Sequence, residues 1–174
     1  TAFDQAPTWV PGVTAKMEDV VRAQEATASD VKENLYGDAE QQKVAQAIIA
    51  EGKARGKSNE EIQGAIAAGI VESGLRELDY GDRDSVGPFQ QRSSWGSTED
   101  RINAESSAKL FYDAFDRATG ETVAERVANT QRPQEDLRGR YAEEMGEAAK
   151  YMQAYADGTA AAYGKGADNF DDWY

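Results

Sequence analysis

The side chains that could do chemistry in this chain are mainly carboxylates. The sequence has 174 residues and contains no cysteine and no histidine. This composition excludes Cys–His and Ser–His–Asp nucleophilic catalysis, disulfide frameworks, and zinc sites built from Cys or His. An enzyme with this composition must work with carboxylates, hydroxyls, amides, lysine or arginine. Elimination therefore favours carboxylate chemistry.

One carboxylate, Glu72, falls in the last turn of a predicted helix. Ser58 and Glu61 form a capping box, and Gly74 supplies the stop, so the spacing predicts a helix between Ser58 and Gly74. An apolar stripe that begins at Ile62 gives this helix a buried face, and Glu72 borders it. Helix carbonyls and apolar neighbours both disfavour the charged carboxylate, which raises its pKa. A carboxyl that keeps its proton near neutral pH can protonate a glycosidic oxygen.

The residues that follow carry a resemblance to a known group of enzymes. Glu72-Ser73 at a helix end, followed by GPFQ at residues 87–90, resembles the E-S…G-[LI]-[MF]-Q signature of lysozyme-like peptidoglycan glycosidases. This group includes lytic transglycosylases and goose-type lysozymes, and the loop at 81–83 resembles the goose-type loop. The stretch from Tyr80 to Trp95 is most similar to transglycosylase-like domains of actinobacteria and of their phages. The similarity covers about residues 44–155, of which 72–95 are specific.

The resemblance implies a mostly α, lysozyme-like helical domain with a short β-hairpin or loop after the catalytic helix. The implied activity is cleavage of the β-1,4 MurNAc–GlcNAc bond of peptidoglycan, with Glu72 as the single general acid/base and with no cofactor or metal. In a lytic transglycosylase, Glu72 then removes a proton from the MurNAc C6 hydroxyl, and a 1,6-anhydro ring closes.

An inverting, goose-type-like lysozyme is the alternative, with Asp82 as the base that activates water. That reaction needs the two carboxyl groups roughly 6.5–9.5 Å apart. Arg92 occupies the second acidic position of the goose-type family, which favours the transglycosylase. Asp82 can equally serve a structural role together with Asp79 and Asp84, because aspartate side chains commonly bond local backbone N–H groups in turns. An EF-hand loop counted from Asp82 fails, because the fifth position is Val86.

Amide and aromatic side chains form the expected wall of the substrate cleft. Amides can bond N-acetyl and hydroxyl groups, and an aromatic face can stack on a pyranose ring. The residues assigned to this wall are Tyr80, Gln90, Gln91 and Trp95. Ser73 is expected to orient the substrate or the acid, or else to bond its own helix backbone. Gln131 is added on a loose match of residues 129–131 to a late polar motif of the family, whose usual Tyr-Asn pair is missing.

Three segments are expected along the chain. Residues 1–36 are predicted as an N-terminal arm and helix, residues 37–157 as the catalytic domain, and residues 158–174 as a tail or linker stub. Within the domain, further helices are predicted after Asp38 and Asn103, at about 121–129, and as one long helix at about 135–155. Tyr141, in the stripe of the last helix, is expected in the core with an edge near the cleft.

Charge narrows the expected partners. A net charge of −13 argues against nucleic acid or an anionic membrane, and no apolar run approaches the ~18 residues of a spanning helix. The chain starts at Thr1 without a signal peptide, which predicts processing or excision from a longer chain. We expect peptidoglycan glycan strands as the partner, other virion or cell-wall modules beside it, and an extracellular, cell-wall or phage-virion location. A non-catalytic glycan-binding module and a phage tail or tape-measure segment are the alternatives.

Overall fold

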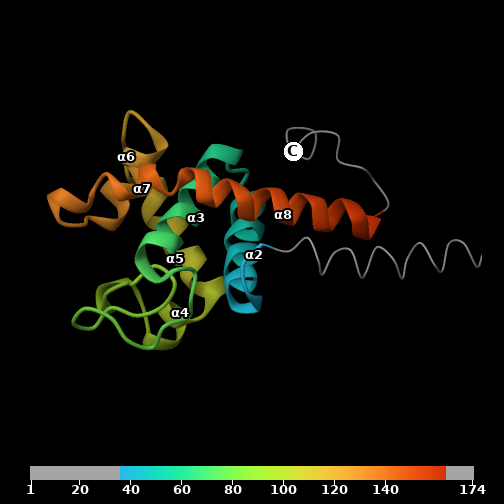
Figure 1. Cartoon of the computed structure of the whole chain (residues 1–174). Coiled ribbons are helices and arrows are strands. Elements are labelled where there is room, and N and C mark those ends of the chain that lie inside the picture. The colour runs from blue at the N-terminus through green and yellow to red at the C-terminus, as the bar shows by residue number, and fades with distance from the viewer. Residues whose placement is uncertain (1–35, 164–174) are drawn as a thin grey trace, which may run out of the picture. The chain divides into compact units, whose positions relative to one another are not determined.

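The computed structural model describes residues 36–163, and for residues 159–163 the backbone alone. The arm and helix expected before residue 36 and the tail expected beyond residue 163 lie outside the described residues. Contacts group Leu35–Tyr155 into one compact unit. The prediction of a mostly α fold is confirmed, since helices make up most of the described part of the chain (Figure 1).

The helices follow one another with short connections. In chain order they are α2 (Ala39–Ala54), α3 (Asn59–Ser73), the 3-10 helix η1 (Ser93–Trp95), α4 (Thr98–Ile102), α5 (Ala104–Arg117), α6 (Val123–Gln131), the 3-10 helix η2 (Glu135–Leu137), α7 (Arg140–Glu143) and α8 (Met145–Tyr163). None of the helices between residues 36 and 163 combines the length and apolar character that crossing a bilayer would need.

Local capping signals fix where the main helices begin. Ser58 forms the predicted capping box at the start of α3, and Asp38, predicted only to begin a helix, forms a second capping box at the start of α2. Asn103 caps α5 by accepting hydrogen bonds from the backbone N–H groups of Glu105 and Ser106. Gly74 ends α3 in the left-handed conformation, with φ of 66°. These ends place Glu72 one residue before the end of α3.

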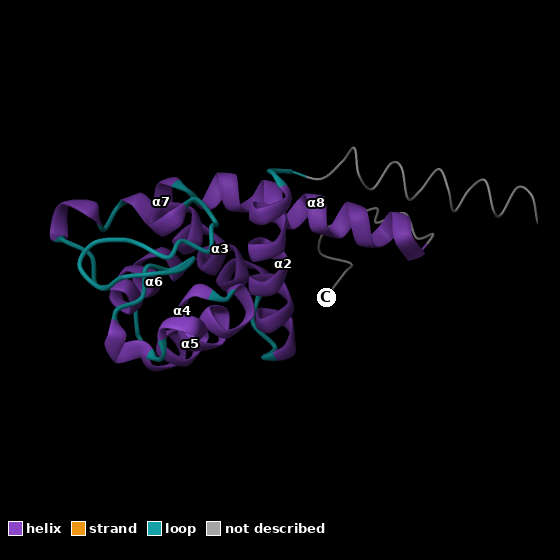
Figure 2. Cartoon of the chain, turned by 90° about the horizontal axis from the view of Figure 1, so that it is seen from below, coloured by secondary structure: helices purple, strands orange, loops and turns teal. Residues whose placement is uncertain are grey.

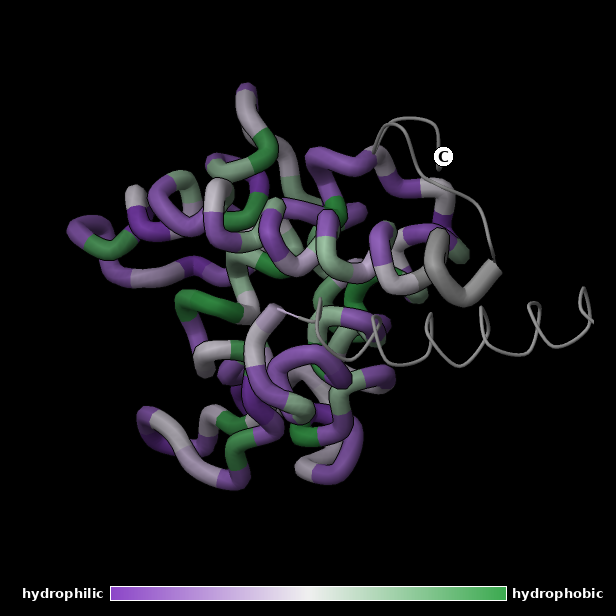
Figure 3. The backbone as a smooth tube through the Cα atoms, turned by 45° about the vertical axis from the view of Figure 1, so that its right-hand side comes forward, coloured by the Kyte–Doolittle hydropathy of each residue, from purple (hydrophilic) through white to green (hydrophobic). Residues whose placement is uncertain are grey.

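Helix α3 packs against three other helices of the unit. It contacts α2, α6 and α7, and α5 in turn contacts α2, α4 and α6. Residues 65–68 of α3 are completely buried. In Figure 3 many of the hydrophobic positions lie where these helices meet. The second part of the core is aromatic: the rings of Phe89 and Phe111 stack with their centroids 4.5 Å apart.

Two predicted elements differ from the structure. The expected hairpin is not confirmed, because residues 36–163 contain no strand (Figure 2) and only an isolated antiparallel bridge joins Val86 and Gln91. The expected long helix at 135–155 is wrong in its first half, which is broken into η2, α7 and the start of α8. Gly139 and Gly146, poor helix formers, flank this break. The break lets Tyr141 turn into the core, where it is 1% exposed.

Candidate active site

The Glu72 carboxyl lies at the edge of the core and is bound to one neighbour. The Tyr141 hydroxyl donates a hydrogen bond of 2.6 Å to Oε1 of Glu72. Tyr141 comes from α7, which packs on α3. Glu72 itself is half-buried. Since Oε1 is occupied by Tyr141, Oε2 is the oxygen available to carry a transferable proton.

The surroundings of Glu72 favour its protonated form. Burial raises the pKa of the Glu72 carboxyl above its ordinary value, while the Tyr141 hydrogen bond and the positive charge of Arg140 act to lower that pKa. Burial is the largest of these effects, so the net direction is upward. The pKa of the Tyr141 phenol is raised as well, by burial and by Glu72, so Tyr141 acts as a hydrogen-bond donor and stays protonated.

Ser73 connects the end of α3 to the turn at 87–90. Its hydroxyl lies 2.7 Å from the Pro88 carbonyl and 3.2 Å from the Gly69 carbonyl, and it accepts a hydrogen bond from the Arg76 backbone N–H. The hydroxyl is therefore used by the backbone, which matches the plainer of its two expected roles. By bonding the turn, Ser73 fixes the helix end that carries Glu72.

The turn at 87–90 has little room for change. Gly87 has φ of +80°, and a Cβ atom there would come within 1.7 Å of the Arg101 carbonyl oxygen. Gln90 also has a positive φ, 48°, and its amide nitrogen donates to the carbonyls of Tyr80 and Gly87. Gln90 thus ties the loop at 80–81 to the turn, and its amide nitrogen is occupied within the protein.

Gln131 reaches the same turn from α6. Its amide nitrogen lies 3.3 Å from the Phe89 carbonyl oxygen. Gln131 and Ser73 therefore bind neighbouring carbonyls, those of Phe89 and Pro88. Of the sequence-predicted residues, Ser73 and Gln131 are brought together at this turn, and Glu72 precedes Ser73 at the end of α3.

Gln91 is a correction to the expected cleft wall. It is 1% exposed, and its amide nitrogen donates to the Ser107 carbonyl of α5 at 3.1 Å. Its amide oxygen is buried and has no hydrogen-bond partner within the described residues. Gln91 cannot meet a ligand on a cleft surface, because the bridge to Val86 turns its side chain into the core.

The loop at 79–84 projects into solvent. The Asp82 side chain is 90% exposed, and its nearest charged neighbour is Arg83 at 4.0 Å. Within residues 36–163 no hydrogen bond or ion pair joins Asp82 to Glu72. Tyr80 is 68% exposed, as an accessible platform requires. Asp84 differs from Asp82, because hydrogen bonds from Ser93 and Arg92 hold the pKa of its carboxyl far below the usual range.

Arg101 binds backbone carbonyls of the loop between residues 84 and 97. The sequence did not predict this role. Arg101 is 4% exposed, and its guanidinium donates to the carbonyls of Asp84 at 2.7 Å and Gln91 at 2.8 Å. It also donates to the carbonyls of Gly96 and Ser97. A guanidinium offers five donors in a fixed fork, which suits it to collecting several carbonyls. No local signal separates this arginine from a solvent-exposed one in a polar stretch.

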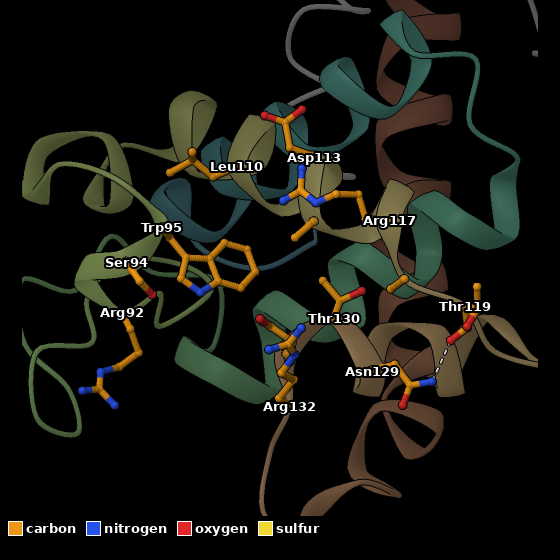
Figure 4. Close-up of a pocket in the computed structure, with 13 residues that line it drawn as sticks. Arg92, Ser94, Trp95, Leu110, Asp113, Arg117, Thr119, Asn129, Thr130 and Arg132 are labelled. Atoms are coloured by element: carbon orange, nitrogen blue, oxygen red, sulfur yellow. Dashed lines mark hydrogen bonds between the residues drawn. The ribbon is translucent and has the colours of Figure 1, made fainter.

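A groove lies beside the turn. It has a volume of about 760 Å³ and is lined from η1, α5 and α6 (Figure 4). Trp95 and Gln131, both predicted site residues, line it together with Arg92, Arg117 and Arg132. Glu72 is not among its lining residues. The indole of Trp95 points into the groove in Figure 4, so Trp95 is an accessible aromatic face.

Within residues 36–163 no cluster of three or more His, Cys, Asp or Glu side chains could hold a metal ion. No protein-family model matches the chain, and no curated protein matches it significantly.

Proposed function

We propose that this domain cleaves the glycan strand of bacterial peptidoglycan, with Glu72 as the single general acid/base. The observation that carries the proposal is the half-buried Glu72 carboxyl at the end of α3, whose pKa is raised by burial and whose Oε1 is fixed by Tyr141. The resemblance of residues 72–95 to lysozyme-like glycosidases supplies the substrate: the β-1,4 bond between MurNAc and GlcNAc.

The reaction we propose needs one carboxyl and no water. Protonated Glu72 gives its proton to the glycosidic oxygen as the bond from that oxygen to the MurNAc C1 breaks. The resulting carboxylate then removes the proton from the MurNAc C6 hydroxyl, and O6 forms a new bond to C1. The products are a free GlcNAc hydroxyl and a 1,6-anhydro-MurNAc end, and Glu72 is protonated again.

The position of Asp82 supports the transglycosylase over the hydrolase. A base that activates water has to be held in place opposite the acid. Asp82 is instead almost fully exposed on a loop, and Arg83 is its one ion-pair partner among residues 36–163. Asp84, the neighbouring carboxylate with firm partners, is bound to Arg92 and to the Ser93 backbone.

The proposal predicts a location as well as an activity. Its substrate lies outside the cytoplasmic membrane, so we propose that the domain acts at the cell wall, as part of a secreted protein or of a phage virion. The acidic net charge of −13 gives no electrostatic attraction to an anionic wall. Neighbouring modules would then have to hold the domain at its substrate.

The test is release of soluble fragments from purified peptidoglycan by the parent chain and by Glu72→Gln. Glu60→Gln is the matched control, because Glu60 is an exposed glutamate in the first turn of the same helix. We expect release by the parent and by Glu60→Gln and none by Glu72→Gln. Equal release by all three proteins would place the acid elsewhere. No release from several kinds of wall would leave a glycan-binding domain.

A further inference from the structure

The groove between η1, α5 and α6 is positively charged in an acidic protein. The chain has a net charge of −13, yet three arginines and a single carboxylate, Asp113, are among the residues that line the groove. Two of these charges are already matched: Arg92 pairs with Asp84, and Asp113 pairs with Arg55. Clustered cations of this kind select anionic ligands.

Two arginines remain without a partner in the described part of the chain. The side chains of Arg117 and Arg132 make no hydrogen bond or ion pair there, although Asp113 lies one turn before Arg117 on α5. Arg132 ends α6 with φ of 54°, in the left-handed conformation where glycine is usual. An arginine at this strained position is consistent with a use for its side chain, and the groove is where that side chain lies (Figure 4).

The rest of the groove offers an aromatic face and few free polar groups. Asn129 donates to the Thr119 carbonyl at 2.6 Å and accepts from Arg138, and the Thr130 hydroxyl donates to the Arg126 carbonyl. These groups are satisfied internally. The aromatic and charged groups that a ligand would meet are the indole of Trp95 and the two guanidiniums of Arg117 and Arg132. This combination suits a carboxylate on an aliphatic chain.

The groove is connected to the candidate acid through the turn at 87–90. Gln131 lines the groove and bonds the Phe89 carbonyl, while Ser73, next to Glu72, bonds the Pro88 carbonyl. In peptidoglycan the stem peptide leaves the glycan at MurNAc, beside the bond that is cut, and it carries free carboxylates. Four extended residues reach roughly 13 Å, so a stem can extend from the cleaved bond along a neighbouring groove.

We propose that this groove binds the stem peptide of the substrate, with Arg117 and Arg132 holding its carboxylates and Trp95 packing against its aliphatic part. The inference rests on the proposed function, and it gives the substrate class of that site: glycan strands that carry peptide, in preference to bare glycan. A wall polymer rich in phosphate is the competing anion, and the test separates the two.

The test compares binding of two ligands by calorimetry. The ligands are the GlcNAc–MurNAc disaccharide with a tetrapeptide stem and the same disaccharide without the stem. The proteins are the full chain, Arg117→Gln/Arg132→Gln, and the control Lys109→Gln/Lys150→Gln. The control removes two positive charges from exposed positions outside the groove. Soluble teichoic acid is run as a third ligand.

We expect the parent and the control to bind the stem-bearing ligand at least about tenfold more tightly than the bare one, with the preference weakening at high salt. The double arginine variant should lose the preference and keep its affinity for the bare disaccharide. The inference is overturned if the parent shows no preference for the stem-bearing ligand, or if the double arginine variant keeps that preference. It is also overturned if the lysine control loses the preference equally, or if the arginines are needed only for binding teichoic acid. If the stem-peptide inference fails but fragment release still depends on Glu72, the proposed cleavage activity stands. If fragment release does not occur either, both the inference and the proposed activity are wrong.

Discussion

The end of α3 and the loop at 79–84 carry neighbouring parts of the same sequence signature, but their side chains are held very differently. At the end of α3, Glu72 is half-buried and bound by Tyr141, and Ser73 is bonded to the turn at 87–90. On the loop, Asp82 is 90% exposed and Tyr80 is 68% exposed. Burial raises the pKa of the Glu72 carboxyl. This difference in burial is the reason we propose the acid/base role for Glu72 and not for Asp82.

The largest expected effect is that of Glu72→Gln. An amide keeps the shape of the carboxyl and can accept the Tyr141 hydrogen bond, but it cannot deliver a proton. Fragment release should fall by a factor of about 10³ or more, with an unchanged circular dichroism spectrum. A fall of less than tenfold would show that α3 does not supply the acid.

Gly87→Ala tests whether the turn at 87–90, to which Ser73 at the end of α3 is bonded, is rigid. The new Cβ would meet the Arg101 carbonyl oxygen at 1.7 Å, and φ of +80° disfavours alanine. We expect the free energy of unfolding to drop by more than about 3 kcal/mol in urea titrations. Gly139→Ala is the matched control, because nothing lies within 4 Å of a Cβ there and its φ of −68° is ordinary. Equal stability of the two variants would contradict a rigid turn.

Tyr141→Phe should move the pH dependence of activity. Protonated Glu72 is the form that donates, so cleavage falls as pH rises through its pKa. The Tyr141 hydrogen bond lowers that pKa, so its loss should raise the pKa further and move the alkaline fall to higher pH. The free energy of unfolding should drop by about 1 kcal/mol. Initial rates from pH 4 to 9 provide the check, and an unmoved or acid-shifted fall would contradict this account of Glu72.

Asp82→Asn has the smallest expected effect. An exposed carboxylate paired with Arg83 at 4.0 Å contributes little to stability, and it takes no part in the proposed reaction. Fragment release should stay within about twofold of the parent. A loss as large as that of Glu72→Gln would instead make Asp82 the base of a hydrolase.

Local signals in the sequence predicted the helix that carries Glu72. The capping box at Ser58 and Glu61 and the left-handed Gly74 depend on residues within a few positions, so the two ends of α3 could be read directly. Glu72 was predicted as the candidate acid because it borders the apolar stripe of this helix. The tyrosine that binds it could be placed in the core but not matched to Glu72, because 69 positions separate the two residues.

The sequence did not predict which polar residues after the turn are buried. Gln91 has the type of a sugar-binding residue, yet it is buried against Ser107, and Arg101 gathers backbone carbonyls beneath the loop. Whether such side chains face solvent or the core depends on packing between distant segments. The burial of a polar side chain therefore cannot be predicted from residue type and spacing alone. The breaks around α7, which let Tyr141 reach the core, likewise depend on contacts with helices that are distant in the sequence.

The most direct test of the central claim is the chemistry of the new chain ends. Purified peptidoglycan is digested in water enriched in heavy oxygen, with the parent chain and with Glu72→Gln, and the fragments are analysed by mass spectrometry. We predict 1,6-anhydro-MurNAc ends without incorporated heavy oxygen from the parent, and none from Glu72→Gln. Reducing MurNAc ends that carry heavy oxygen would contradict the account, because they would mean that a water molecule, and a second group to activate it, takes part.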